Sequence, residues 1–295
     1  MVGVLLLIPA DSLDPKRPDE HFAREAATAN ELVITTCLLD HNALTQLNSP
    51  ETVVRRVRTS SDDAVYRGWM VTADQYSQLD QALRTRDVQL RTRPAAYATA
   101  HHLPGWYEAF RDLTPTSVYV DTADLAGIAD VVRAALPAGP GVIKDFVKSM
   151  KHYWHEAAFV PDVHDDAALM AIVERFVELR GEDLVGGIVV RAFEELIGNE
   201  ARTWWINGSC ALVTAHPDTP DAMLAIGAEI SSIASPIRAL GAPFVTVDVA
   251  YHRDGRLRVI EVGDGQVSDL PSSVNPRQLL VALAGHSEQN GGTSA

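Results

Sequence analysis

The chain has 295 residues, 46% hydrophobic and 22% charged, which is the composition of a globular protein large enough for two domains or one large one. Acidic residues outnumber basic ones 39 to 25, and the net charge of −14 argues against general affinity for nucleic acid or an anionic membrane. No apolar run approaches the roughly 20 residues that a membrane-spanning helix needs. Cys37 and Cys210 lie in strand-like apolar segments, so we expect buried thiols in a reducing compartment, the cytoplasm.

The first 93 residues are predicted to form an α/β domain. Residues 2–8 are an apolar run too short for a signal peptide and typical of a strand buried on both faces. Residues 32–39 are a second such run, and a helix predicted from Pro18 to Asn30 joins them into a parallel βαβ unit. The other elements predicted in this domain are strands at 51–58, 64–70 and 88–91 and a helix at 73–86.

Residues 94–116 are rich in aromatic residues and histidine. His101 and His102 are adjacent and would point in different directions on a helix, which is poor geometry for joint metal binding. We expect surface or hinge histidines. A strand at 117–121 and a helix at 125–136 follow.

A basic cluster follows the next short apolar strand. The strand ends in Lys144, where a charge should be buried only with a partner. Lys148 and Lys151 follow at helical spacing, and ammonium groups bind phosphates as point charges. The alternative for Lys151 is a solvated helix face. Because the chain has neither GxxxxGK[ST] nor GxGxxG, a phosphate site here would rest on lysines rather than on a glycine-rich loop.

Two further strands and a hairpin follow an amphipathic helix predicted at 168–180. A strand at 186–193 is interrupted by Arg191, and Asn207-Gly208 is a two-residue hairpin signal. Counting outward from that turn, Trp204 faces Ala211 and Arg202 faces Val213. Glu200, Arg202 and Trp204 then share one face, which is either a charge pair beside a packed tryptophan or a polar floor for a ligand.

Residues 244–266 predict a second hairpin, with Asp254-Gly255 as its two-residue turn. That turn pairs Arg253 with Arg256 and Asp248 with Glu261, with the two acidic Cβ atoms roughly 5 Å apart. Like charges so placed destabilise a sheet unless a cation lies between them, and oxygen ligands suit Mg²⁺. The alternative is a solvated hairpin whose acids never meet.

The C-terminal residues complete the pattern. A long helix is predicted at 221–240 and a last helix at 275–285. Between them, the loop after Glu261 carries Asp264, and its glycines let the backbone approach a ligand closely. Residues 286–295 are expected to be a disordered tail.

Taken in order, these motifs resemble the ATP-grasp superfamily. The motifs are the strand ending in Lys144, the strand GGIVVRAF, the Glu200-x-Arg202 strand and the Asp248…Glu261 hairpin. The resemblance implies an α/β (α+β) fold: an ATP-grasp domain over 94–285 after a pre-ATP-grasp domain over 1–93. Its small subdomain would span about 117–190 and its large one about 191–285, with ATP held between them.

The resemblance also implies roles for individual residues. Lys144 resembles the lysine that contacts the ATP phosphates and the adenine side, and Arg202 the basic residue that meets an acyl phosphate or the γ-phosphate. Asp248 and Glu261 resemble the magnesium ligands. The implied nucleotide-binding residues are Lys148, the hinge residues Val190, Arg191, Ala192 and Phe193, and either Glu194 or Glu195 at the ribose.

Two departures from the family pattern place the chain in a divergent clade. The family's last metal-binding glutamate is usually followed by x-Asn, whereas Glu261 is followed by Val262-Gly263, so Asp264 is the candidate third ligand. The glycine-rich loop expected after the phosphate lysine is replaced by FVKSMKHYW, in which Lys148 and Lys151 are the candidate substitutes.

The activity that the resemblance implies is ATP-dependent ligation of a carboxylate to an amine through an acyl phosphate, with ATP and Mg²⁺ as cofactors. The partners would be small-molecule or peptide carboxylates and amines, with neither nucleic acid nor membrane. The alternatives are an ATP-grasp phosphotransferase and a non-catalytic ATP-binding protein. Oligomeric state stays open, with a homodimer the commonest case.

Overall fold

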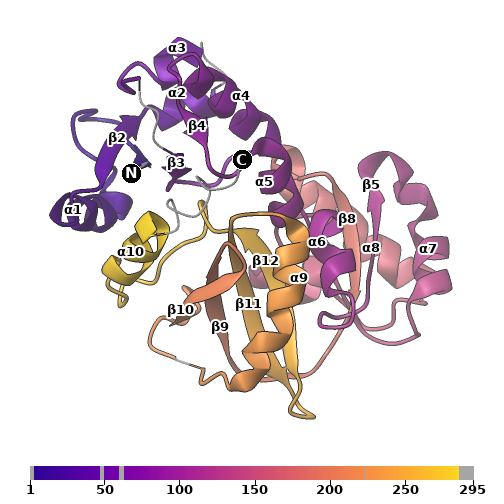
Figure 1. The fold of residues 1–295 in the computed structure, drawn as a ribbon. Helices are drawn as coiled ribbons and strands as arrows, with labels where there is room; N and C mark the ends of the chain where they lie inside the picture. The colour runs from indigo at the N-terminus through magenta and orange to yellow at the C-terminus, as the bar shows by residue number, and fades with distance from the viewer. Residues whose placement is uncertain (1–2, 47–49, 60–62, 223, 286–295) are drawn as a thin grey trace, which may run out of the picture. The chain divides into compact units, whose positions relative to one another are not determined.

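The computed structural model describes residues 3–46, 50–59, 63–222 and 224–285, and the tail predicted at 286–295 lies outside them. These described residues form a mixed α/β protein with three four-stranded sheets (Figure 1). The chain divides into two compact units. The first comprises residues 1–100, 199–249 and 261–295, and the second comprises 101–198 and 250–260.

The first sheet of unit 1 is parallel, in the order β2-β1-β3-β4. Its strands are β1 (Val4–Pro9), β2 (Thr35–Leu39), β3 (Asp63–Tyr66) and β4 (Gln89–Leu90). The helix α1 (Ala23–Glu31), preceded by the 3₁₀ turn η1 (Glu20–Phe22), joins β1 to β2, so the predicted βαβ unit is confirmed. The prediction that β2 is buried on both faces is wrong, because it is an edge strand and Thr35 is exposed.

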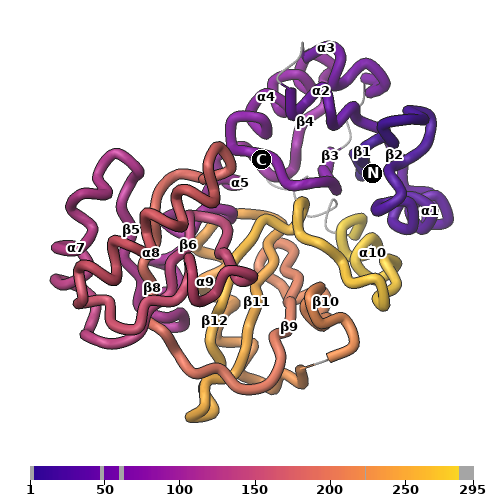
Figure 2. Tube along the Cα trace, turned by 180° about the vertical axis from the view of Figure 1, so that it is seen from behind, coloured from indigo at the N-terminus to yellow at the C-terminus, as the bar shows by residue number. Residues whose placement is uncertain are grey.

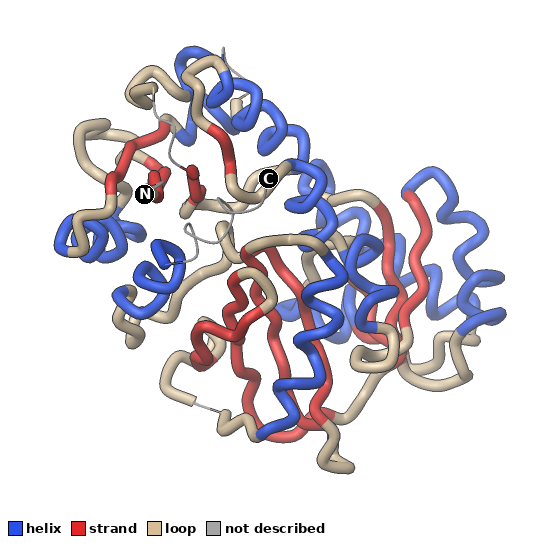
Figure 3. Tube along the Cα trace, viewed as in Figure 1, coloured by secondary structure: helices blue, strands red, loops and turns tan. Residues whose placement is uncertain are grey.

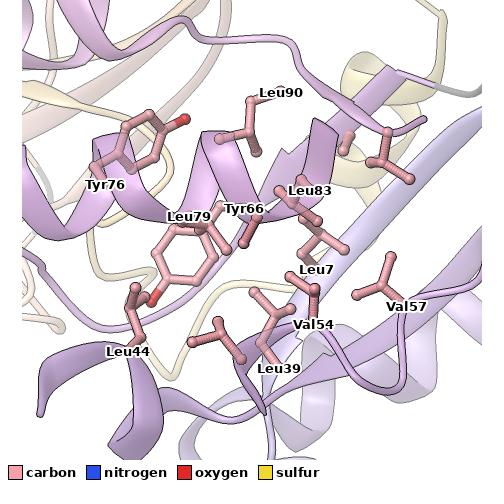
Figure 4. Close-up of a cluster of buried hydrophobic side chains, with 14 of the residues drawn as sticks. Leu7, Leu39, Leu44, Val54, Val57, Tyr66, Tyr76, Leu79, Leu83 and Leu90 are labelled. Carbon is pink, nitrogen blue, oxygen red and sulfur yellow. The ribbon is translucent and has the colours of Figure 1, made fainter. Parts of the chain in front are cut away.

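Residues 51–58, predicted as a strand, are instead a short helix and a turn. The helix α3 (Pro50–Val53) follows α2 (His41–Thr45), and its proline occupies the first helical position. Val53, Val54 and Val57 are buried, a helical spacing that a strand would divide between two faces. They pack against β1 and α4 (Ala73–Arg84), as Figure 4 shows for Val54, Val57, Leu79 and Leu83.

The second sheet of unit 1 has the order β10-β9-β11-β12 (Figure 2). Its strands are β9 (Leu196–Ile206), β10 (Ser209–Ala215), β11 (Phe244–His252) and β12 (Leu257–Asp264). One core joins this sheet to the first one, since Leu6 and Ile8 pack with Trp204, Phe244 and, in the last helix α10 (Arg277–Gly285), Leu280.

The helix predicted at 221–240 is shorter than expected. It begins as the 3₁₀ helix η6 (Ala228–Ile233) and continues as α9 (Ala234–Leu240). Pro236 lies in the first turn of α9, where its missing N–H costs no hydrogen bond. Gly241 ends the helix in the left-handed conformation, with φ 65°.

Both predicted hairpins form, each with a register change. Asn207 and Gly208 have φ of 49° and 75°, as the predicted turn requires. An irregularity between Cys210 and Leu212 then shifts the strands by one residue, so Trp204 lies opposite Leu212 and Arg202 opposite Thr214. The predicted partners Ala211 and Val213 are therefore wrong, because sequence spacing does not reveal a β-bulge.

The turn of the second hairpin has three residues rather than two. His252 N donates to Arg256 O at 2.9 Å, and Gly255 N donates to His252 O at 2.8 Å. Gly255 has φ of 88°, the left-handed residue of a bulged turn. Asp254 turns Arg256 back on itself, accepting both its backbone N–H and its guanidinium. Arg253 therefore does not face Arg256 as predicted.

Unit 2 contains an antiparallel sheet in the order β5-β8-β6-β7. Its strands are β5 (Ser117–Asp121), β6 (Gly141–Asp145), β7 (Phe159–Val160) and β8 (Gly187–Ala192). The helices α7 (Ile128–Ala135) and α8 (Asp166–Arg180) bury their apolar faces on it (Figure 3). Its other elements are α6 (Leu103–Phe110) and the short helices η2 (Thr122–Gly127), η3 (Lys151–Tyr153), η4 (Trp154–Ala158) and η5 (Gly181–Asp183).

Other sequence expectations meet the structure as follows. The boundary between units falls at the end of α5 (Pro94–His101), so His101 lies at a junction, although it is buried rather than on the surface. Cys37 is half-buried and Cys210 is exposed, so the two thiols are not buried as expected. Within the described residues, no helix is long and apolar enough to cross a membrane.

Candidate functional site

The most tightly organised polar cluster of unit 1 is built on neighbouring strands β9 and β11. Arg202 holds both carboxylate oxygens of Asp248, Nε to Oδ1 and Nη2 to Oδ2, each at 2.8 Å. The exposed fractions of these side chains are only 13% and 6%. A bidentate pair so well shielded is rigid and charge-assisted.

Their mutual attraction outweighs the cost of burial in both pKa values. Burial by itself raises the pKa of Asp248, but the charge and hydrogen bonds of Arg202, with His216, hold that pKa well below its usual range. Burial lowers the pKa of Arg202, but Asp248, Glu261 and Asp269 together raise it above its ordinary value. Both groups therefore stay charged at neutral pH.

His216, at the end of β10, adds a third member to the cluster. Its Nε2 lies 3.4 Å from Arg202 Nη2, 3.5 Å from Asp248 Oδ2 and 3.9 Å from Glu200 Oε2. His216 is buried, and its Nδ1 accepts the backbone N–H of Asp218. Glu200 and Arg202 do share a face, as predicted from their spacing, and the polar floor is a network of two acids, an arginine and a histidine.

Asp269 links this cluster to the N-terminal segment. Its backbone oxygen accepts from Arg202 Nη1 at 3.2 Å, and its carboxylate Oδ1 lies 2.7 Å from His21 Nε2. The ring of His21 packs on Trp69, with centroids 4.6 Å apart, and on Phe22 at 4.9 Å. A continuous set of contacts thus runs from β11 to the loop after β3, all within unit 1.

Glu261 lies on β12, next to β11 in the sheet, and its negative charge acts on Arg202. Near the end of the hairpin away from its turn, Gly265 N donates to Phe244 O at 3.0 Å, and Thr246 Oγ1 donates to Gly263 O at 3.4 Å. Continued by two residues, this pairing brings Glu261 opposite Asp248. These contacts support the predicted pairing of the two acids.

Asp264, the candidate third metal ligand, is fully buried in a different polar group. Its Oδ1 accepts from Gln266, through the backbone N–H at 2.9 Å and Nε2 at 3.0 Å. Gln266 Nε2 also donates to Tyr76 OH at 2.7 Å, whereas Asp264 Oδ2 has no hydrogen-bond partner among the described residues. Burial raises the pKa of Asp264 to about 7, although Gln266 and Arg67 act against it.

The donor chemistry at the paired acids suits Mg²⁺, because the carboxylates of Asp248 and Glu261 supply hard oxygen ligands. Among the residues that the structure describes, no group of three or more acidic, histidine or cysteine side chains is arranged to hold a metal ion. Both oxygens of Asp248 are engaged by Arg202, so coordination by Asp248 requires a shift of that guanidinium.

The phosphate lysine of the sequence analysis, Lys144, lies in unit 2 on β6, opposite Val189 of β8, and is 6% exposed. The segment after it is a tight turn and not the predicted helix. Lys144 bridges to Ser149, and Asp145 N donates to Lys148 O at 2.9 Å. Asp145 stabilises the turn, since its Oδ1 accepts the N–H groups of Val147 and Lys148 at 2.7 and 2.5 Å.

His101 shares the surroundings of the two lysines. Burial lowers the pKa of His101 to about 3, and the charges of His102, Lys148 and Lys144 act in the same direction. Lys148 is exposed and Lys151 is exposed on η3. The lysine cluster therefore spreads over a turn and a 3₁₀ helix and does not form a helix face.

The predicted hinge, Val190 to Phe193, closes β8. Val190 lies opposite Val118 on one side and Ile143 on the other. Ala192 N donates to Thr116 O at 2.8 Å and Phe193 N to Pro140 O at 2.9 Å, so two hinge N–H groups have backbone partners. Buried Arg191 donates to Ile260 O at 2.7 Å and ties β8 to β12.

The two ribose candidates differ in exposure. Glu194 makes a bidentate pair with Arg258 at 2.7 Å for each bond, and its side chain is 21% exposed. Glu195 pairs with Arg253 and is 57% exposed. Glu195 is thus the more accessible of the two.

The predicted site residues therefore fall into two groups. Arg202, Asp248, Glu261 and Asp264 belong to unit 1, and Lys144, Lys148, 190–193 and Glu195 belong to unit 2. Sequence reasoning missed His216, Asp269's contact with His21, and Asp145. His216 could have been found from its place just after β10, two residues past Thr214, which faces Arg202. Nothing in the sequence signals His21.

This fold and this arrangement of an Arg–Asp pair and a strand lysine are those of an ATP-grasp protein. Residues 131–283 match the model of an ATP-grasp domain family, described as family 3 of its clade, and the chain belongs to that family. The superfamily expected from the order of the motifs is thereby confirmed, as is the α/β fold class. No curated protein matches the chain.

Solved structures share this fold along nearly the whole chain. A RimK domain ATP-grasp protein from Sphaerobacter thermophilus is 17% identical, with 96% of both chains covered and a TM-score of 0.57. The D-cycloserine synthetase DcsG is 14% identical, with 97% of this chain and 100% of that one covered and a TM-score of 0.61. D-alanine–D-alanine ligase from Bacillus anthracis, complexed with ATP, is 14% identical, with coverage of 97% and 96% and a TM-score of 0.58.

Proposed function

We propose that the chain is an ATP-dependent ligase that joins a carboxylate to an amine through an acyl phosphate and releases ADP and phosphate. The observation that carries the proposal is the buried bidentate pair of Arg202 and Asp248 on adjacent strands, in a member of the ATP-grasp family. A fixed cation beside a carboxylate that can take a metal is what phosphoryl transfer needs, because catalysis there is mainly positioning and charge stabilisation.

In this proposal Arg202 exchanges partners during the reaction. Its guanidinium spans Asp248 and the backbone oxygen of Asp269. A bound phosphoryl group offers the same planar, bidentate match as the carboxylate. Arg202 would then move onto the phosphoryl oxygens as Asp248 turns to the metal, while Lys144 supplies a second fixed positive charge.

The remaining residues take the roles that the family pattern implies. Mg²⁺ held by Asp248 and Glu261 would neutralise charge on the transferring phosphoryl group. Asp264 stays a candidate third ligand through its buried Oδ2, which accepts no hydrogen bond from the described residues. The nucleotide would be bound by Lys144, Lys148, Val190, Arg191, Ala192, Phe193 and Glu195.

The names of the similar structures support the substrate class. One is a D-alanine–D-alanine ligase and another a D-cycloserine synthetase, so small carboxylates and amines are the first compounds to test. Peptides stay within the proposal. The domain limits proposed from the sequence are 1–93 for the preceding domain and 94–285 for the ATP-grasp domain. The free thiols of Cys37 and Cys210 support a cytoplasmic protein.

The decisive experiment is a screen for ADP release with mixtures of carboxylates and amines, followed by the mass of the product. In the active mixture, Asp248→Asn and Glu261→Gln should each lower ADP release by about 10²-fold or more, since metal stabilisation of the phosphoryl charge is worth several kcal/mol. Asp130→Asn, which removes an exposed acid on α7, is the matched control and should keep full activity. Unchanged turnover in both site variants would reject the assignment.

A second candidate function is a non-catalytic ATP-binding protein. The full engagement of Asp248 by Arg202 favours it, because that carboxylate already has a charge partner. Tight Mg-ATP binding without ADP production over the whole mixture would support this alternative. A phosphorylated product without an amide bond would instead identify an ATP-grasp phosphotransferase.

A further inference from the structure

A histidine and aspartate pair in unit 1 has no role in the function proposed above. His21 Nε2 lies 2.7 Å from Asp269 Oδ1, within the distance of a strong hydrogen bond. The side chains of His21 and Asp269 are 38% and 48% exposed, so the pair is accessible to small molecules. His21 comes from η1 and Asp269 from the loop after β12, 248 residues later.

The imidazole is held on three sides. Trp69 packs on its face at 4.6 Å with an angle of 36° between the ring planes, and Phe22 packs edge-on at 4.9 Å. Trp69 is itself fixed, because its Nε1 donates to Asp19 Oδ2 at 3.1 Å. Asp19 Oδ1 accepts the backbone N–H of His21 at 2.9 Å. These contacts orient the ring and leave Nδ1 without a hydrogen bond to any described residue.

The pair adjoins the residue proposed to hold the acyl phosphate. Asp269 binds His21 with its side chain and accepts from Arg202 Nη1 with its backbone oxygen at 3.2 Å. One residue therefore connects the oriented imidazole to the guanidinium. The charged groups around the ring are Asp269 and Asp19, and the neighbouring Arg67 is neutralised by Glu25 at 2.6 Å.

An oriented imidazole beside an acyl phosphate suits one chemical task, the removal of a proton from the attacking amine. An amine is mostly an ammonium ion at neutral pH and has no lone pair until that proton leaves. A histidine whose second nitrogen is held by a carboxylate is an effective proton acceptor, because the carboxylate fixes the tautomer and stabilises the imidazolium.

We propose that His21 is the general base of the ligation step and that Asp269 is its positioning residue, an inference that rests on the proposed ligase function. The ammonium proton moves to His21 Nδ1, and the freed lone pair forms the C–N bond to the acyl carbon. The C–O bond to the phosphoryl group breaks, and its electron pair leaves with the phosphate. The second amine proton is taken by the phosphate, and His21 returns its proton to solvent.

The test compares two nucleophiles in the same enzyme. Hydroxylamine is largely unprotonated at neutral pH and traps an acyl phosphate as a hydroxamate without a general base. The assay uses the twenty common amino acids as the carboxylate pool with Mg-ATP. One arm contains hydroxylamine, and the other contains a panel of primary amines with the amino acids themselves.

In His21→Gln, we expect hydroxamate formation to stay within about twofold of the original chain. Amide formation at pH 7 should fall about 10²-fold, the usual contribution of a general base. The deficit should shrink as the pH rises, because the free amine then becomes abundant without help. Asp269→Asn should lower amide formation less and shift its pH profile, whereas His155→Gln, an exposed histidine on η4, should change nothing.

Three results would overturn the inference. Equal losses of hydroxamate and amide in His21→Gln would show a structural role, and unchanged amide formation would show no role. An original chain that forms hydroxamate but no amide with any amine would also exclude a built proton acceptor. Failure of the original chain to form any ATP-dependent hydroxamate would instead reject the ligase function itself.

Discussion

Single side chains in this protein acquire their properties from burial and partners. Asp248 and Asp264 are both buried aspartates, yet the pKa of Asp248 is well below the usual range and that of Asp264 is raised to about 7. Arg202 accounts for the difference, because it pairs directly with Asp248, while the carboxylate of Asp264 accepts from the uncharged Gln266. The same residue type therefore serves as a fixed anion at one place and as a proton carrier at another.

His101 leads to a prediction about stability and pH. Its pKa in the folded chain is about 3, below the ordinary value of 6.5, so the unfolded chain binds the proton more readily. Its stabilising contribution is therefore complete above pH 6.5 and is lost as the pH falls toward 3. At pH 5 the free energy of unfolding should be lower than at pH 7 by about 2 kcal/mol from this group.

Urea unfolding at pH 5 and pH 7 measures this effect, with His101→Gln as the test variant and His155→Gln as the exposed control. The test variant should lose the pH-dependent part of its unfolding free energy, and the control should keep it. An identical pH dependence in His101→Gln and the original chain would contradict the assignment.

At the scale of elements, backbone approach decides which positions accept a side chain. In β8, a Cβ added at Gly187 would lie 2.0 Å from Val120 O of the neighbouring strand β5. At Gly127, before α7, an added Cβ would meet no described atom within 4 Å. The two glycines lie in the same unit, so they make a matched pair for a substitution.

We therefore expect Gly187→Ala to lower the free energy of unfolding by about 1–3 kcal/mol, because the strand pair must separate to admit the methyl group. Gly127→Ala should be neutral or slightly stabilising. Denaturant midpoints of the two variants check this, and equal midpoints would show that β5 and β8 yield more easily than their contacts indicate.

The sequence predicted the elements better than their registers. Both hairpins were located by Asn207-Gly208 and Asp254-Gly255, because only a few residue pairs tolerate left-handed backbone conformations. The partners across each hairpin were wrong by one residue, since bulges depend on the packing of both strands. Residues 51–58 were predicted as a strand because valines and arginines fit either spacing, and the core around Val54 and Val57 selected the helix.

At the scale of the whole molecule, the proposed function predicts a ligand-dependent stability. A ligand that binds only the folded chain raises its unfolding free energy, by about 2.7 kcal/mol at a hundred times its dissociation constant. Magnesium with a non-hydrolysable ATP analogue should therefore raise the melting temperature. Asp248→Asn and Lys144→Ala should each reduce that rise, measured against the same variant without nucleotide.

Asp130→Asn should show the full rise. Binding by the original chain that persists unchanged in both Asp248→Asn and Lys144→Ala would exclude these residues as nucleotide ligands. No rise in the original chain would argue against ATP binding itself, and catalysis is not needed for either result.

The sequence alone determined the succession of elements, the family and the residue types at the candidate site, because hydrophobic periodicity, turn residues and motif order are local properties of the chain. Only the tertiary structure decided which charges meet. It joined Asp248 to Arg202, His216 to both, and His21 to Asp269, partners between 14 and 248 residues apart. Such contacts depend on strand order, bulges and loop packing, and these follow from the burial of the whole chain and not from any one segment.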